Sequence, residues 1–211
     1  PMRHPLRALL ATLALAALPA LAQDTYKIDP VHSEVSFKIR HLLSKTSGRF
    51  TKFTGTIKVD PADMSKSSVE VTIDAASINT DNEKRDTHLR SPDFFDVAKY
   101  PTITFESKDV RREGDRVIVK GTLRMHGVAR DVEIPFLAAE GMNGAGVQTW
   151  SYRATLPLDR LDYGIGADSV AAKISLKRPV ELDLLLVGFF EDPPAAAKAG
   201  PARKPRPQAV K

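Results

Sequence analysis

The sequence of 211 residues contains no cysteine and only one tryptophan. Without cysteine there is no disulfide framework, no thiolate ligand for zinc and no cysteine nucleophile. Hydrophobic residues nevertheless make up 42% of the chain, which is enough for an ordinary core and argues against a wholly disordered protein. The fold must therefore be stabilised by the packing of apolar side chains.

Residues 23–190 have no net charge, although the whole chain has a formal charge of +5. That segment contains 24 basic and 24 acidic residues, so the surplus lies in the two ends of the chain. Binding to a nucleic-acid backbone depends on clustered basic side chains that neutralise phosphates. The charge distribution therefore gives no support for nucleic acid as a partner.

Long apolar runs are also missing, with one short exception near the start of the chain. Two arginines precede an apolar run over residues 8–18, and a small-x-small pattern ends at Ala22. This order is typical of a secretory signal peptide, whereas a membrane-spanning helix needs about 20 apolar residues. We expect residues 1–22 to be removed during export and the mature protein to be periplasmic.

The other end of the chain, residues 191–211, is rich in Ala, Pro and Lys and lacks apolar periodicity. Such a segment cannot bury enough apolar surface to offset the entropy of ordering, so we expect a disordered tail. Its basic residues favour a transient membrane contact, and a purely solubilising role fits the same composition equally well. The folded domain is then expected at residues 23–190.

Between these ends, apolar residues alternate with polar ones in eight short segments. Such alternation is typical of half-buried antiparallel strands with one face in water. A further segment, 25–28, is expected to continue a neighbouring strand, which leaves about eight strands. The alternating segments are 35–39, 53–59, 69–73, 103–105, 117–125, 132–136, 150–156 and 180–186.

One segment between the strands breaks the alternation. Residues 80–83 have the capping-box sequence Thr-Asp-Asn-Glu, and the polar residues up to Arg90 predict a short exposed helix. A Ser-Pro pair at 91–92 predicts a second short helix that holds Phe94 and Phe95 against the sheet. These patterns predict an all-β sandwich or a closed barrel with a helical insert. A closed eight-stranded barrel can hold a small ligand.

A series of motifs runs through the same region. They are Asp29-Pro30-Val31-His32-Ser33, His41-Leu42-Leu43-Ser44, Gly48-Arg49-Phe50, Ala76-Ser77-Ile78-Asn79-Thr80, Arg85-Asp86-x-His88-Leu89-Arg90-Ser91, Asp93-Phe94-Phe95-Asp96, Tyr100-Pro101-Thr102-Ile103-Thr104-Phe105, His126-Gly127-Val128 and Asp162-Tyr163-Gly164-Ile165-Gly166. Together they resemble the YceI-like family of exported lipocalin-like proteins, which bind polyisoprenoid and related long-chain lipids. The resemblance covers residues 24–188 approximately. It implies an extended eight-stranded antiparallel lipocalin-like barrel with an apolar tunnel, a short helical insert and no catalytic chemistry.

The apolar faces of the strands supply the expected ligand-binding residues, since the resemblance places the ligand in the barrel lumen. No cofactor is expected to be required, apart from a bound isoprenoid or acyl lipid. The expected lumen residues are Val35, Phe37, Ile39, Phe53, Ile57, Val71, Ile73, Ile103, Phe105, Val119, Leu123, Trp150 and Tyr152.

Catalytic and metal-binding residues are not expected. The four histidines after residue 22 are scattered at positions 32, 41, 88 and 126, which does not favour a metal site. A hydrolase triad of Ser33, His32 and Asp29 is disfavoured, because adjacent residues of a strand point to opposite faces.

We therefore interpret the chain as an exported carrier that holds a polyprenyl quinone or a polyprenyl phosphate. A fatty acid or fatty amide is the second ligand class. A quinone-linked redox accessory protein and a structural stress protein with a filled barrel are the alternative functions. The sequence does not choose between a monomer and a homodimer.

Overall fold

A computed structural model describes residues 23–60, 62–142 and 148–190. The expectations for residues 1–22 and 191–211 lie outside these described residues. The strands are β1 (Asp24–Ile28), β2 (Glu34–His41), β3 (Ser44–Phe50), β4 (Phe53–Val59), β5 (Ser68–Asp74), β6 (Ile78–Asn79), β7 (Thr102–Glu113), β8 (Arg116–Met125), β9 (Val128–Met142), β10 (Gln148–Asp159) and β11 (Leu176–Phe190). The helices are α1 (Glu83–Arg90) and α2 (Val170–Ser175), and the 3₁₀ turns are η1 (Met64–Lys66), η2 (Ala75–Ser77) and η3 (Arg160–Tyr163).

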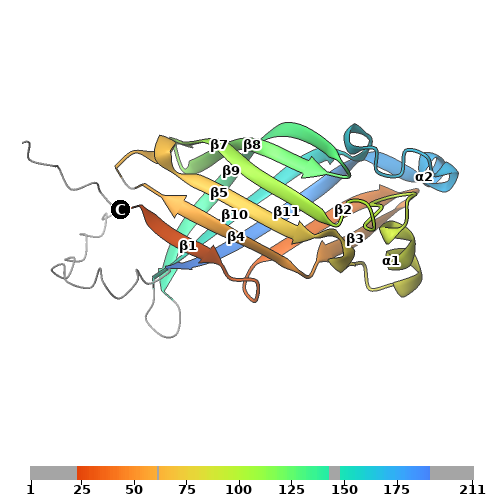
Figure 1. Cartoon of the computed structure of the whole chain (residues 1–211), viewed down its shortest axis with the longest axis horizontal. Coiled ribbons are helices and arrows are strands. Elements are labelled where there is room, and N and C mark those ends of the chain that lie inside the picture. The colour runs from red at the N-terminus through yellow and green to blue at the C-terminus, as the bar shows by residue number, and fades with distance from the viewer. Residues whose placement is uncertain (1–22, 61, 143–147, 191–211) are drawn as a thin grey trace, which may run out of the picture.

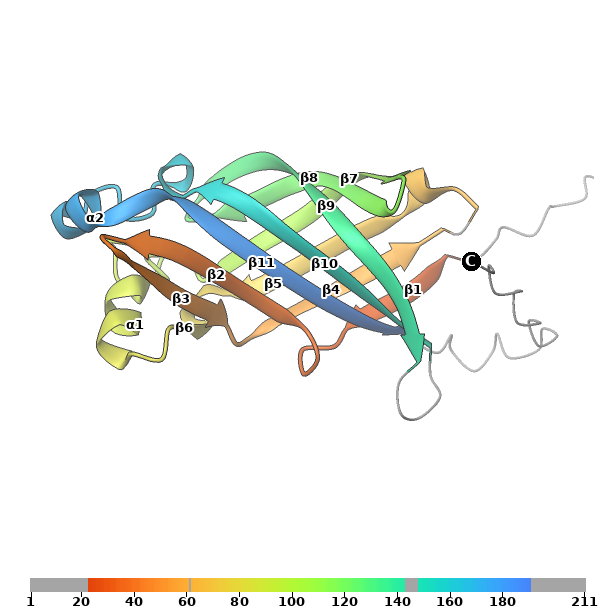
Figure 2. The same ribbon diagram turned by 180° about the vertical axis from the view of Figure 1, so that it is seen from behind.

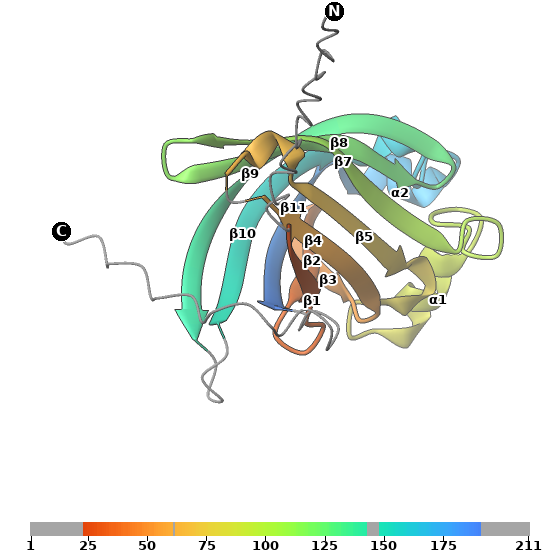
Figure 3. The ribbon, with the colours of Figure 1, turned by 60° about the vertical axis from the view of Figure 1, so that its left-hand side comes forward.

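The strands form one closed antiparallel barrel. They pair in the order β1–β4–β5–β7–β8–β9–β10–β11, and β11 pairs back with β1 (Figure 3). β2 follows β1 along the same edge of β11, β3 pairs with β2, and β6 pairs with β3. Each of the pairs β1/β2, β3/β4 and β5/β6 therefore occupies one strand position, and the predicted eight-stranded barrel is confirmed.

The break between β1 and β2 is bridged by a backbone bond from Asp29 N to Val187 O at 2.8 Å and by the side chain of Ser33. Residues 29–33 leave the sheet at Pro30, which has no N–H to donate. Ser33 Oγ accepts a hydrogen bond from Val187 N at 2.8 Å and donates one to Val187 O at 3.3 Å. The sheet thus stays paired through a bend in its first strand position.

Both helices lie at one end of the elongated barrel (Figures 1 and 2). We call this the helical end, formed by α1, α2 and the turn between β2 and β3. The start of β1 and the last residues of β11 lie at the opposite end, which we call the far end. The two ends of the barrel therefore differ in the elements that lie there.

The helical insert differs from the sequence expectation in two details. α1 begins after Asn82, whose side chain accepts from Arg85 N, so Thr80 is not the N-cap. Thr80 is instead buried, and its backbone N–H donates to Asp86. The prediction of a second helix after Ser91 was wrong, because residues 91–99 form consecutive turns. Phe94 is nevertheless buried at that position.

α2 was not expected from the sequence. It begins after Ser169, whose hydroxyl accepts from Ala172 N. The preceding turn needs two residues with positive φ, and glycines occupy both positions, Gly164 at 72° and Gly166 at 67°. This turn and helix lie between β10 and β11 and cover part of the barrel opening at the helical end.

Candidate functional site

A cavity of about 340 Å³ lies inside the barrel at the helical end. Apolar side chains from β2, β5, β7, β8, β10 and β11 form its wall. Leu89 of α1, Phe94 and Phe95 of the following turns, and Ala172 of α2 line it at the opening. Small-molecule sites typically have volumes of about 300–1,000 Å³, so this cavity is large enough for a small apolar ligand or part of a longer one.

A layer of side chains closes the cavity towards the middle of the barrel. On β5, Ile73 lines the cavity, Val69 lines a second cavity of about 30 Å³ at the far end, and Val71 between them lines neither. Phe105 on β7 and Leu184 on β11 have the same intermediate position. We call Val71, Phe105 and Leu184 the middle layer. The tunnel implied by the family resemblance is therefore divided in this structure.

The expected lumen residues are distributed over three zones of the barrel interior. Those that line the cavity at the helical end are Val35, Phe37, Ile39, Ile73, Ile103 and Leu123. Those that line the small cavity at the far end are Ile57, Val119 and Tyr152. Those that line neither are Phe53, Val71, Phe105 and Trp150, of which Phe53 and Phe105 are buried and the other two are half-buried.

Several cavity residues were missed by the sequence reasoning. Val180 and Leu182 belong to an alternating segment that was recognised, so their phase could have identified them. Met125 continues the alternation of Leu123 in the same way. Arg160 carries no such signal, because it is a charged residue at the end of a strand pattern.

Arg160 is a buried cation in the wall of this apolar cavity, with an exposed fraction of 5%. Its Nε donates to Lys177 O at 3.1 Å, its Nη1 to Ile165 O at 2.7 Å and its Nη2 to Ala172 O at 3.3 Å. A guanidinium has five N–H groups, so these bonds leave two of them for other acceptors. Burial lowers the pKa of Arg160, partly offset by the nearby Asp159 carboxylate.

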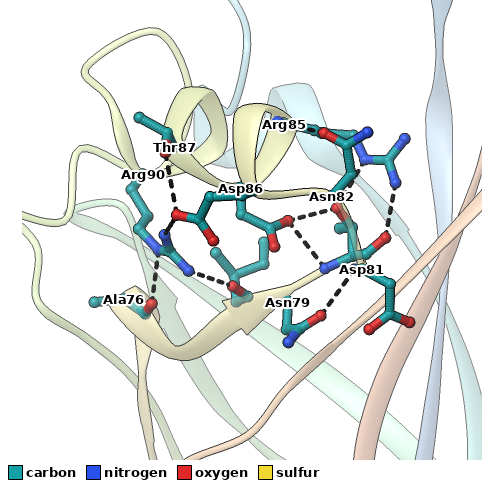
Figure 4. A network of polar contacts seen from close by, with 11 residues as sticks. Ala76, Asn79, Asp81, Asn82, Arg85, Asp86, Thr87 and Arg90 are labelled. Carbon is teal, nitrogen blue, oxygen red and sulfur yellow. Dashed lines mark hydrogen bonds and ion pairs between the residues drawn. The ribbon is translucent and has the colours of Figure 1, made fainter.

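The position of α1 over the cavity is fixed by a polar network (Figure 4). The Asp86 carboxylate is buried and accepts from both the backbone N–H and the hydroxyl of Thr80. Arg85 Nε donates to the Thr80 hydroxyl at 2.7 Å. Arg90 Nε donates to Ala76 O at 2.8 Å, which attaches the end of the helix to the turn before β6. The helix that partly closes the cavity is thus held by named bonds at both ends.

Of the three residues considered for a hydrolase triad, His32 and Asp29 contact each other, whereas Ser33 bonds elsewhere. His32 Nδ1 lies 2.6 Å from Asp29 Oδ2, and the hydrogen bond from His32 lowers the pKa of Asp29. Ser33 bonds to the backbone of Val187. Within the described residues, no three His, Asp or Glu side chains lie close enough to hold a metal ion. None of the helices in the described part of the chain has the length and apolarity needed to cross a membrane.

The comparison with protein families decides the classification. The YceI-like domain matches residues 26–186, which cover all eight strand positions. The chain belongs to the YceI-like family. Among curated relatives, a UPF0312 protein of Vibrio cholerae is 36% identical over 175 residues, covering 80% of this chain and 92% of the relative.

Solved structures have the same architecture as this YceI-like domain. BcnA from Burkholderia cenocepacia aligns with a TM-score of 0.68 and 28% identity, covering 76% of this chain and 98% of BcnA. A polyisoprenoid-binding domain from Saccharophagus degradans aligns with a TM-score of 0.60 over 79% of this chain and 98% of that domain. Its identity is 19%, so this second similarity concerns the fold.

Proposed function

We propose that this YceI-like protein is a non-catalytic carrier of one long-chain isoprenoid lipid, either a polyprenyl quinone or a polyprenyl phosphate. The observation that carries the proposal is the apolar cavity at the helical end, which is lined in part by residues of α1 and α2. Membership of the family supports a lipid-binding barrel. The Saccharophagus domain of the same fold, described as polyisoprenoid-binding, supports the isoprenoid class of ligand.

The energetics of such a cavity suit exchange with a membrane. Removing a methylene group from water contributes about 0.8 kcal/mol whether the new surroundings are a bilayer or a dry protein cavity. Moving an apolar chain from one to the other is therefore nearly neutral, and only exposure to water in transit is unfavourable. A carrier of this kind can accept and release lipid without an energy source.

The size of the cavity limits how much of the ligand is enclosed. A volume of about 340 Å³ is at the lower end of the range for ligand sites, roughly 300–1,000 Å³. A polyprenyl chain of many units must therefore displace the middle layer of Val71, Phe105 and Leu184 or extend out between the helices. The volume alone favours a short chain or a partly enclosed one.

Arg160 supports a proposal for the orientation of the ligand. Two N–H groups of a buried guanidinium in an apolar wall would donate to a phosphate, a carboxylate or a quinone carbonyl oxygen. We propose that the polar end of the lipid lies near Arg160 and that its chain points towards the middle layer. The same contact supports the second ligand class, a fatty acid, because a carboxylate has equivalent acceptors.

Export to the periplasm is part of the proposal and rests on the sequence of residues 1–22. Their basic start, short apolar run and small-x-small pattern support a signal peptide. N-terminal sequencing of the protein isolated from its native cell tests this directly. We expect the mature chain to begin at Gln23.

The decisive experiment is mass spectrometry of organic extracts from the protein purified from its native host. We expect one isoprenoid lipid per chain. Ile39→Asp places a carboxylate in the cavity wall, and a bound chain would remove water from that charge at a cost of several kcal/mol. We expect at least a tenfold loss of lipid from this variant, with strand content retained by circular dichroism.

Ser47→Asp is the matched control. Ser47 is exposed on the neighbouring strand β3, so the substitution introduces the same charge outside the barrel. It should keep full lipid occupancy. If folded Ile39→Asp retains as much lipid as Ser47→Asp, the cavity is not the binding site and the proposal is wrong.

A further inference from the structure

Four large apolar side chains are exposed at the helical end of the barrel. Leu42 and Leu43 form the turn between β2 and β3, with exposed fractions of 59% and 105%, and Val170 and Ile174 on α2 are 71% and 77% exposed. The two segments are adjacent, since Leu42 N donates to Ser175 O at 2.9 Å and the hairpin turn lies beside α2 in Figure 2. We call these four residues the apolar tip.

The apolar tip is not typical of a water-exposed turn. A two-residue hairpin turn usually has glycine or asparagine where φ is positive, whereas Leu42 has a φ of 51°. Val170 and Ile174 are spaced by one helical turn and therefore share a face of α2. The other large apolar side chains exposed in the described residues are Val31, between β1 and β2, and Leu137, on β9.

Basic side chains flank the apolar tip. Arg40 and Lys45 lie on either side of the hairpin turn, Lys173 lies on α2, and Lys177 follows it; all four are exposed. Asp168 is the single acidic residue in the two segments 40–45 and 168–177. Within the described part of the chain, none of these four cations has a carboxylate within the 4 Å of an ion pair. The tip therefore combines an apolar centre with unpaired positive charge.

The same elements line the cavity on their inner side. Ala172 and Ser175 of α2 face the cavity, while Val170 and Ile174 on the same helix are exposed. Ile39 and His41, at the end of β2, line the cavity directly before the hairpin turn. A surface in contact with the tip would therefore adjoin the opening through which a ligand enters.

We propose that the apolar tip and its four basic residues dock the barrel onto a bilayer that contains anionic phospholipid. Apolar side chains insert at the boundary of head groups and acyl chains, and lysine and arginine are attracted to anionic head groups. Stable protein interfaces use about 20–30 residues on each side, far more than this tip supplies. The purpose of docking, to pass lipid into the cavity, rests on the proposed function; the docking itself does not.

Flotation with phospholipid vesicles tests the proposal. The full-length mature protein is mixed with vesicles of phosphatidylcholine alone or of phosphatidylcholine with phosphatidylglycerol, at low and at high salt. We expect binding to the anionic vesicles that weakens as salt rises. The double variant Leu43→Ser/Ile174→Ser should bind at least tenfold more weakly. Val31→Ser is the matched control, because it removes an equally exposed apolar side chain at a different place.

A separate measurement distinguishes docking from lipid binding. Lipid supplied from detergent micelles should fill the double variant as fully as the unchanged protein, while transfer from anionic vesicles should be slower. If the double variant floats as well as Val31→Ser, or if the unchanged protein shows no preference for anionic vesicles, the docking proposal is wrong. If the protein floats as expected but takes up no lipid from either source, docking is supported and the proposed function fails.

Discussion

The aromatic ring of Phe37 lies directly over the backbone of Gly48, its cross-strand partner on β3. A Cβ atom added at Gly48 would lie 2.5 Å from Phe37 Cζ and 2.7 Å from Thr80 Cγ2, closer than side-chain atoms approach in proteins. The missing side chain therefore creates the space that the ring occupies. Because Phe37 also lines the cavity, Gly48 indirectly sets the cavity's shape.

Gly48→Ala should force the Phe37 ring into the cavity and reduce the lipid bound per chain. Overpacking of this kind typically costs about 1–3 kcal/mol of stability, so the midpoint of thermal unfolding should also fall. Gly141→Ala is the control, since the nearest atom to a Cβ at Gly141 is Thr149 Oγ1 at 3.4 Å. Equal lipid occupancy in the two variants would show that the position of the Phe37 ring does not limit how much lipid the cavity binds.

Phe105→Ala should join the cavity at the helical end to the space beyond the middle layer. The substitution removes a buried ring and should cost about 3–5 kcal/mol of stability. The folded fraction should nevertheless bind longer polyprenyl chains relative to short ones, measured by competition between two chain lengths. Phe136→Ala at the far end is the control, because it loses a similarly buried ring without opening the middle layer. Identical chain-length preferences would contradict the divided lumen.

Asp86→Ala should loosen α1 over the cavity. It leaves the N–H and the hydroxyl of Thr80 without their common acceptor in a buried site, at a cost of about 1–3 kcal/mol for an unsatisfied group. We expect faster exchange of bound lipid, measured by stopped-flow transfer of a fluorescent analogue. Lys84→Ala, on an exposed face of the same helix, should leave the exchange rate unchanged. An unchanged rate in Asp86→Ala would show that α1 does not control access.

Tyr163→Phe should raise stability by about 1 kcal/mol, which is unusual for a change at a buried residue. The Tyr163 hydroxyl is buried, and among the described residues it has no hydrogen-bond partner. When the chain folds, this hydroxyl loses its hydrogen bonds to water and gains none in return, which is unfavourable. Removing the hydroxyl therefore removes that unfavourable free energy. Chemical denaturation near pH 7 measures this difference, and a destabilised variant would contradict the observed environment.

Alkaline pH should destabilise the protein through the half-buried Tyr152 and the buried Tyr163. Burial raises the pKa of Tyr152 and of Tyr163 to about 12, against an ordinary value of 10. Between about pH 10 and pH 12 the unfolded chain therefore binds fewer protons than the folded one, so the free energy of unfolding falls as pH rises. The slope of this fall should be smaller in Tyr163→Phe, as measured by denaturation at a series of pH values.

The alternation predicted strands, and the family resemblance was needed to choose a barrel over a sandwich; neither predicted the extent of the cavity. Alternation identified most strands because each has one wet and one apolar face. It missed β3, whose inward positions include Gly48, because a glycine covered by the ring of another strand gives no apolar signal. It also missed α2, a short helix whose apolar Val170 and Ile174 face outward. Whether an inward side chain lines a void or fills it depends on packing between strands distant in sequence, as Phe105 illustrates.

The pairing of β1 with β11 has a consequence for the order of folding. It joins the first and last strands of the described barrel, Tyr26 to Phe190, so it requires the closure of a very long loop. Loop closure becomes entropically more costly with length, and pairings of this kind form slowly. Until β11 is in place, the remaining strands form an open sheet with two free edges and one uncovered apolar face. A chain in which β11 has not yet paired therefore needs protection from edge-to-edge aggregation at both of these edges.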